Sequence, residues 1–111
     1  MKRYELYAVN LDPTIGVEMQ KTRPCLIVSP DEMNRNLQTV IVAPLTTINR
    51  NIPSRIKIDA STTNGLLETS YVALDQIKTI DKRRCRNRIG VISDSDAIIV
   101  SDLIVKIFRY S

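Results

Sequence analysis

TVIVAPLT, residues 39–46, is the stretch that decides the fold of this chain. Its β-branched and apolar side chains favour extended backbone, so the stretch predicts a strand. Pro44 has no N–H to donate to a neighbouring strand, which indicates a bulge or an edge near the strand's end. Hydroxyl, amide and cationic side chains follow at residues 46–50, so a polar loop begins where this strand stops.

Similar short runs lie on both sides of this strand. Residues 5–11 and 55–59 alternate between apolar and polar side chains, and residues 24–29 form a short apolar run. Residues 70–80 predict a strand pair or one long, bent strand, and residues 88–92 a last short strand. Between them, residues 14–23 predict a mobile loop and residues 30–37 a turn or one short helix. Six or so short strands at close spacing predict a small antiparallel barrel or sandwich.

The period of the apolar residues changes after residue 92. Ser93 followed three residues later by Asp96 resembles a capping box, which begins a helix. The next apolar residues fall at i, i+3, i+4 and i+7, the stripe of an amphipathic helix: Val100, Leu103, Ile104 and Ile107. With 111 residues the chain is long enough for one hydrophobic core and too short for two. We therefore expect one α+β, mainly β domain over residues 1–111, closed by a C-terminal helix.

Histidine is absent, which excludes a large part of enzyme chemistry. A Ser-His-Asp or Cys-His nucleophile and a histidine pair that passes protons are impossible. The two cysteines, Cys25 and Cys85, are distant in sequence and expected to be free thiols, so we expect no zinc site. Catalysis would have to rest on Arg, Lys, Asp, Glu, Ser, Thr or Tyr side chains.

The N-terminal residues give no sign of export. MKRYELYAVN, residues 1–10, is charged and polar from the start, unlike a signal peptide. No run approaches the ~18–20 apolar residues needed to cross a bilayer. We therefore expect a cytoplasmic protein that does not associate with membranes.

Basic residues exceed acidic ones, giving a formal net charge of +4. The excess is concentrated between Lys82 and Arg88, where five of seven residues are basic. One interpretation is a surface that binds a polyanion such as nucleic acid. The other is a solvated turn on a modestly basic protein, and the charge alone leaves both open.

Two loops carry the side chains suited to phosphate chemistry. Arg23 stands immediately before the apolar run at residues 24–29, after a loop that contains Gly16. Its planar guanidinium fits phosphate oxygens. At the end of the predicted strand over residues 39–46 lies a cluster of polar side chains: Thr46, Thr47, Asn49 and Arg50. Fixed donors that converge on one point would stabilise the extra charge of a pentacoordinate phosphorane. Ordinary turn chemistry explains the same residues, so spacing alone does not decide.

Three segments resemble the signature segments of the MazF/PemK (Kid) family of toxin endoribonucleases. A D-x-x-x-G-x-E loop that leads into R-P is matched by Asp12, Gly16, Glu18, Arg23 and Pro24. A V-x-P-x-T segment is matched by Val42, Pro44 and Thr46. A D/E-Q-x-R/K-T-I-D segment is matched by Asp75 through Asp81, with Lys78 in the basic position. The likeness extends over nearly the whole chain, and three motifs in order are far more specific than one.

The resemblance implies an SH3-like β-barrel with a C-terminal helix, assembled as a homodimer whose RNA groove spans the subunit interface. It implies cleavage of single-stranded RNA, with no metal or cofactor, to a 2′,3′-cyclic phosphate and a 5′-hydroxyl. Arg23 and Thr46 match the positions that the family uses for catalysis, and an acidic, MazE-like antitoxin is the implied partner. The resemblance also implies these RNA-binding residues: Glu18, Lys21, Thr47, Asn49, Arg50, Asp75, Gln76 and Lys78.

Departures from the family pattern keep two alternatives open. Met19, Gln20 and Lys21 replace the Gln and small residues that commonly follow the glutamate, in a loop that contacts RNA in relatives. A non-cleaving binding module is therefore one alternative. The other is a gyrase poison of the CcdB group, which shares the fold, although its C-terminal tryptophan has no counterpart here.

Overall fold

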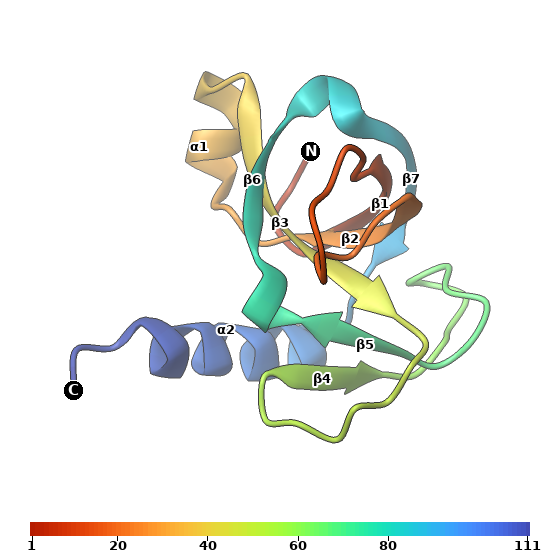
Figure 1. Ribbon diagram of the computed structural model, residues 1–111, viewed down its shortest axis with the longest axis vertical. Helices are drawn as coiled ribbons and strands as arrows, with labels where there is room; N and C mark the ends of the chain where they lie inside the picture. The colour runs from red at the N-terminus through yellow and green to blue at the C-terminus, as the bar shows by residue number, and fades with distance from the viewer.

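The computed structural model describes residues 1–111, which form a curved antiparallel sheet with one long helix against it (Figure 1). The strands are β1 (Glu5–Asn10), β2 (Thr22–Ile27), β3 (Thr39–Thr46), β4 (Arg55–Ile58), β5 (Ser70–Ala73), β6 (Lys78–Asp81) and β7 (Cys85–Val91). The helices are α1 (Asp31–Asn36) and α2 (Asp94–Phe108), with single 3₁₀ turns η1 (Leu74–Gln76) and η2 (Lys82–Arg84). No helix is long and apolar enough to cross a membrane.

Strand β3 is the centre of the sheet. The strand order is β4-β5-β3-β2-β1-β7, and β6 pairs with β3 beside β5. Every pairing is antiparallel. The predicted class, mainly β with a C-terminal helix, is confirmed. The strand pairings do not close the barrel, because β7 pairs with β1 alone.

Pro44 lies where β3 changes partner. Thr39–Val42 pair with β6, and Leu45 and Thr46 pair with β5. Ala43 and Pro44 fall in the gap between these two pairings, where a residue without an N–H leaves no ladder hydrogen bond unmade. Pro44, for which the sequence predicted a bulge or an edge, thus marks the point along β3 at which the neighbouring strand changes from β6 to β5.

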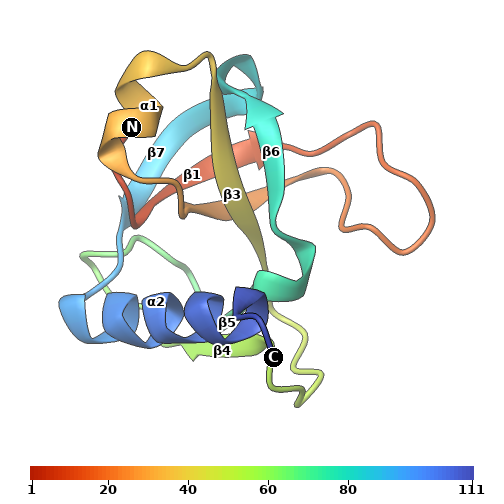
Figure 2. The same ribbon diagram turned by 90° about the vertical axis from the view of Figure 1, so that its left-hand side faces the viewer.

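Two groups of buried residues occupy the two faces of the central strands. One contains Leu26 and Leu45 and extends to Val100 of α2, and the other contains Cys25 and Val42. Because neighbouring residues of a strand point to opposite faces, β2 and β3 are buried on both sides. Helix α2 begins at Ser93, whose hydroxyl accepts from the Asp96 N–H at 3.1 Å, and it crosses beside β4 and β5 (Figure 2).

Three sequence-based boundaries need correction. Residues 70–80 are two strands, because the turn η1 interrupts them at Leu74–Gln76. The last strand begins at Cys85 rather than at residue 88, since Val9 pairs with Cys85 and extends the ladder into the basic segment. Strand β2 begins at Thr22, so Arg23 belongs to the sheet and not to the preceding loop.

Two loop glycines differ in how closely other atoms approach them. Gly16 and Gly65 both have a positive φ, at 59° and 71°. A Cβ on Gly65 would overlap the carbonyl oxygen of Ile89, whereas a Cβ on Gly16 would meet nothing within 4 Å. Gly16→Ala should cost about 1–2 kcal/mol for the backbone conformation alone. Gly65→Ala should cost about 1–3 kcal/mol more through overlap. If urea unfolding shows the same loss of stability for both variants, the main chain at Ile89 moves aside at no cost and the expected overlap is wrong.

Candidate active site

The register of β2 and β3 brings Arg23 and Thr46 together. Cys25 pairs with Pro44, so the same register, continued by two residues, sets Arg23 opposite Thr46. Opposite residues of antiparallel strands share a face, with Cβ atoms about 5 Å apart. Both side chains line one cavity of about 480 Å³, together with Arg50, Asp75 and Gln76. The fold therefore gathers five of the predicted site residues in one place.

The Arg23 guanidinium is fixed by main-chain carbonyls. Its Nε donates to the Gln20 oxygen at 3.1 Å, and its Nη1 donates to the Leu45 oxygen at 3.2 Å. Leu45 directly precedes Thr46, so this second bond holds the guanidinium beside the threonine. The remaining N–H groups are available for an anion in the cavity. A fixed cation of this kind can stabilise charge that develops in a reaction.

Thr46 is oriented by the turn that follows it. Its Oγ1 accepts from the Ile48 N–H at 3.2 Å. A hydroxyl that accepts from the backbone keeps its own hydrogen for donation. Thr46 is half-buried and lines the cavity that holds Arg23. The pair therefore presents one neutral and one charged donor to a bound phosphate.

Asp75 is held by two residues that the sequence analysis missed. Arg55 of β4 donates to both carboxylate oxygens, Nε–Oδ1 at 2.7 Å and Nη2–Oδ2 at 3.0 Å, and Ser54 Oγ donates to Oδ1 at 3.0 Å. The Arg55 side chain is only 8% exposed. These hydrogen bonds, that from Arg55 above all, lower the pKa of Asp75 below its ordinary value. Its carboxylate thus supports the cavity wall, and the predicted contact of Asp75 with RNA stays a prediction. The alternation along β4 places Arg55 on the face opposite the buried Ile56 and Ile58, where an exposed cation is the ordinary expectation, so no sign of this partnership appears in the sequence.

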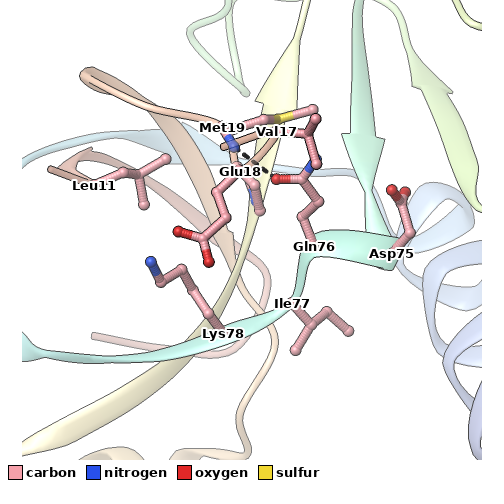
Figure 3. A pocket seen from close by; sticks show the side chains of 9 residues that line it. Leu11, Val17, Glu18, Met19, Asp75, Gln76, Ile77 and Lys78 are labelled. Carbon is pink, nitrogen blue, oxygen red and sulfur yellow. Dashed lines mark hydrogen bonds between the residues drawn. The ribbon is translucent and has the colours of Figure 1, made fainter. Parts of the chain in front are cut away.

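A second cavity of about 390 Å³ lies beside the first (Figure 3). Val17, Met19, Asp75 and Gln76 line both cavities, and Glu18 and Lys78 line the second alone. The Met19 N–H donates to Gln76 Oε1 at 2.7 Å, so the long β1–β2 loop is fastened to η1 at the shared wall. Gln76 therefore has a partner within the chain, while its amide nitrogen stays available as a donor.

The remaining predicted residues lie outside these two cavities. Thr47 lines a third cavity of about 520 Å³, together with Pro24 and Arg88. Asn49 Oδ1 accepts from the Asn51 N–H at 2.8 Å, which closes a local turn. The main chain of Lys21 closes the base of the β1–β2 loop through Leu11 and Asp12. The structure does not bring these three side chains to Arg23 and Thr46.

The basic segment from Lys82 to Arg88 is engaged with its own chain. Arg83 pairs with Asp81, Arg88 with Glu5, and Lys82 donates to the Asn34 carbonyl. Arg84 donates to the carbonyls of Asn10 and Asp12, at the base of the β1–β2 loop. Only Arg86 has no partner. Neither interpretation offered by the charge is complete, because η2 and β7 use most of these cations to join segments. No group of three or more acidic, cysteine or histidine side chains gathers where a metal would bind.

Comparison with known proteins gives consistent matches. The family model of PemK-like, MazF-like toxins of type II toxin-antitoxin systems matches residues 2–108. The chain is 35% identical over 96 residues to the endoribonuclease EndoA of Bacillus subtilis, covering 85% of this chain and 82% of that protein. It is 36% identical over 96 residues to the endoribonuclease MazF of Staphylococcus saprophyticus, covering 85% and 79%. The solved toxin MazF-mt6 of Mycobacterium tuberculosis is 28% identical with a TM-score of 0.80, covering 96% and 98%.

The Arg55–Asp75 pair makes a prediction about pH. Arg55→Met should lower the free energy of unfolding by about 1–3 kcal/mol at pH 7, between the values for exposed and buried pairs. The pKa of Asp75 is lower in the folded protein than in the unfolded chain, where it is about 3.9. The ion pair therefore stabilises the fold at pH values above the unfolded pKa, and this stabilisation is lost as the pH falls through the folded pKa. The gap between wild type and variant in urea unfolding should be constant above about pH 5 and shrink below about pH 4.

The control for this prediction lies on the same strand. Lys57 faces Asp59 at 3.9 Å with its side chain 63% exposed, so Lys57→Met should change stability by less than about 0.5 kcal/mol. A gap for Arg55→Met that persists unchanged at pH 3 would contradict the assignment of the pair to a charged Asp75.

Proposed function

This chain belongs to the family of PemK-like, MazF-like toxins of type II toxin-antitoxin systems, and on that premise we propose that it is an endoribonuclease that cuts single-stranded RNA. The observation that carries the proposal is the pair of Arg23 and Thr46, set opposite each other in an open cavity. The two relatives compared by sequence are both endoribonucleases. They give no support to the gyrase-poison alternative.

The arrangement suits a metal-free transesterification. The ribose 2′-hydroxyl attacks the adjacent phosphorus, and the bond from phosphorus to the 5′-oxygen breaks. The products are a 2′,3′-cyclic phosphate and a 5′-hydroxyl, so the proton lost by the nucleophile is balanced by one gained by the leaving oxygen. Arg23 stabilises the added negative charge, and Thr46 donates a hydrogen bond to a phosphoryl oxygen. A guanidinium is a poor base, so Arg23 acts as a charge stabiliser or proton donor.

Of the other residues that line the two cavities, some would contact the RNA and others hold the cavity walls in place. Arg50 supplies a second cation in the Arg23 cavity, Gln76 supplies a donor at the wall that the two cavities share, and Lys78 supplies one in the second cavity. Asp75, held by Arg55, keeps η1 and therefore Gln76 in place. We assign Asp75 a positioning role. In the cell the substrate is mRNA in the cytoplasm, and the inhibitor is an acidic, partly disordered antitoxin segment that covers the same cations.

The outer face of α2 supports assembly into a homodimer. Val100 is buried against the core, but Ile98, Val105 and Phe108 are exposed, Phe108 by 69%. An exposed apolar strip of this kind marks an interaction surface. Pairing of two identical helices about a two-fold axis buries it with one self-complementary contact, and the RNA groove then spans the two subunits.

Removal of either catalytic donor should abolish most activity without unfolding the protein. Arg23→Ala and Thr46→Ala should each lower the cleavage rate of a long RNA in EDTA by at least ~10²-fold, the scale for losing one transition-state donor. Arg35→Ala on α1 and Thr62→Ala in the β4–β5 loop, both exposed, are matched controls that should cut normally. If the site variants keep wild-type rates and circular dichroism, the assignment is wrong.

The apolar face of α2 should control assembly. Light scattering at tens of micromolar should give the mass of a dimer for the wild type and of a monomer for a Val105→Glu, Phe108→Glu double variant. Two buried carboxylates on each side of a symmetric contact are strongly unfavourable. Leu37→Glu, which also charges an exposed apolar residue but lies beyond α1, should remain dimeric. A wild-type monomer would refute a groove built from two subunits.

A further inference from the structure

Glu18 and Lys78 face each other across the second cavity without touching. Their carboxylate and ammonium groups point toward one another (Figure 3). The four ion pairs of the chain, however, join Arg55–Asp75, Lys57–Asp59, Arg83–Asp81 and Arg88–Glu5. Glu18 Oε1 accepts from the Ile15 N–H at 2.8 Å, which fixes the carboxylate, and Oε2 has no partner. The second cavity is therefore lined by an acceptor, Glu18 Oε2, and a donor, the Lys78 ammonium, that form no ion pair with each other.

The rest of the lining suits a flat aromatic ligand. Leu11, Met19, Pro44 and Ile77 form apolar walls, and the volume of about 390 Å³ lies within the range of small-molecule pockets. Nucleobases bind proteins by this combination of apolar contact with the ring and hydrogen bonds to its edge. A carboxylate beside bound RNA is repelled by the phosphates unless it accepts a hydrogen bond from the RNA. A nucleobase can donate such a hydrogen bond, and a phosphate cannot.

We propose that this cavity is a guanine-binding pocket, an inference that rests on the proposed function and adds the base that the enzyme reads. Guanine alone among the four bases offers two adjacent donors, N1–H and the N2 amino group, to one carboxylate. Its O6 and N7 acceptors lie on the adjoining edge, where an ammonium can reach both. Adenine, cytosine and uracil each present a single donor group to Glu18, and an acceptor beside that donor would face the carboxylate.

The position of the pocket sets which nucleotide it reads. It shares the wall formed by Met19 and Gln76 with the cavity that holds Arg23 and Thr46. A base in the pocket therefore belongs to a nucleotide next to the scissile phosphate. The Gln76 amide nitrogen lies at the boundary and is free to donate to the same base. Glu18 and Lys78 are thus specificity-determining residues, separate from the catalytic pair.

The test maps cut sites and then removes single atoms from the base. Wild-type protein should cut a long RNA of mixed sequence only where guanine occupies one fixed position beside the cut. In a short RNA with that cut site, inosine lacks the N2 amino group, and it should lower kcat/KM by about 10-fold or more, the scale of one good edge contact. Glu18→Gln should reduce the preference for guanosine over inosine to less than about threefold. Glu32→Gln on exposed α1 should leave it intact.

The outcomes separate this inference from the proposed function. Cleavage that depends on Thr46 but shows no guanine at a fixed position, or a guanosine preference that Glu18→Gln leaves unchanged, overturns the pocket and leaves the nuclease. If no RNA is cut, fluorescence anisotropy with 2′-O-methyl RNAs that carry guanine or adenine decides the inference. Tighter binding of the guanine RNA that Glu18→Gln abolishes supports the pocket, and equal binding overturns it.

Discussion

The double burial of β3 is the constraint on which the rest of the structure depends. β2 runs along one edge of this strand, and β6 and then β5 run along the other. A slip of one residue would turn every side chain to the opposite face, so burial on both faces fixes the register. That register sets Arg23 opposite Thr46. Strands β5 and β6 both pair with β3, and the turn η1 connects them where the partner of β3 changes near Pro44. This connection places Asp75 and Gln76 in the cavity that Arg23 and Thr46 line. The placement of the proposed catalytic pair is therefore a consequence of core packing.

The site is rigid on one side and adjustable on the other. Asp75 accepts from Arg55 of β4, and Arg23 donates to the Leu45 carbonyl of β3 as well as to the Gln20 carbonyl at the end of the β1–β2 loop. The β1–β2 loop crosses from β1 to β2 and is fastened to η1 by the single Met19–Gln76 bond. One such bond contributes only about 0.5–1.5 kcal/mol. Because this contact uses Gln76 Oε1, the Gln76 amide nitrogen can donate to a base in the proposed pocket while the loop stays fastened.

The sequence predicted the elements better than their junctions. The alternation of residues 55–59 and the stripe from Val100 to Ile107 follow local periods, so β4 and α2 appear where they were expected. Arg23 and Thr46 came from motifs, and nothing local shows that they face each other, because their meeting depends on pairing between β2 and β3. The partnership of Arg55 with Asp75 joins residues 20 positions apart through the β4–β5 pairing. The sequence shows both side chains, but the strand register that brings Arg55 to Asp75 cannot be read from it.

The basic residues between Lys82 and Arg88 mostly join parts of the chain, although the net charge suggests a surface that binds a polyanion. Four of the five cations between Lys82 and Arg88 already join strands, turns or the loop base within the chain. Few cations therefore remain beside the cavities to neutralise phosphates, chiefly Arg23, Arg50 and Lys78. Phosphate contacts position a nucleic acid strand without reading it, and affinity that rests on few of them depends weakly on salt. On the proposed function, most of the RNA-binding energy is then expected to come from the bases, and the proposed pocket would distinguish them through one acceptor and one donor.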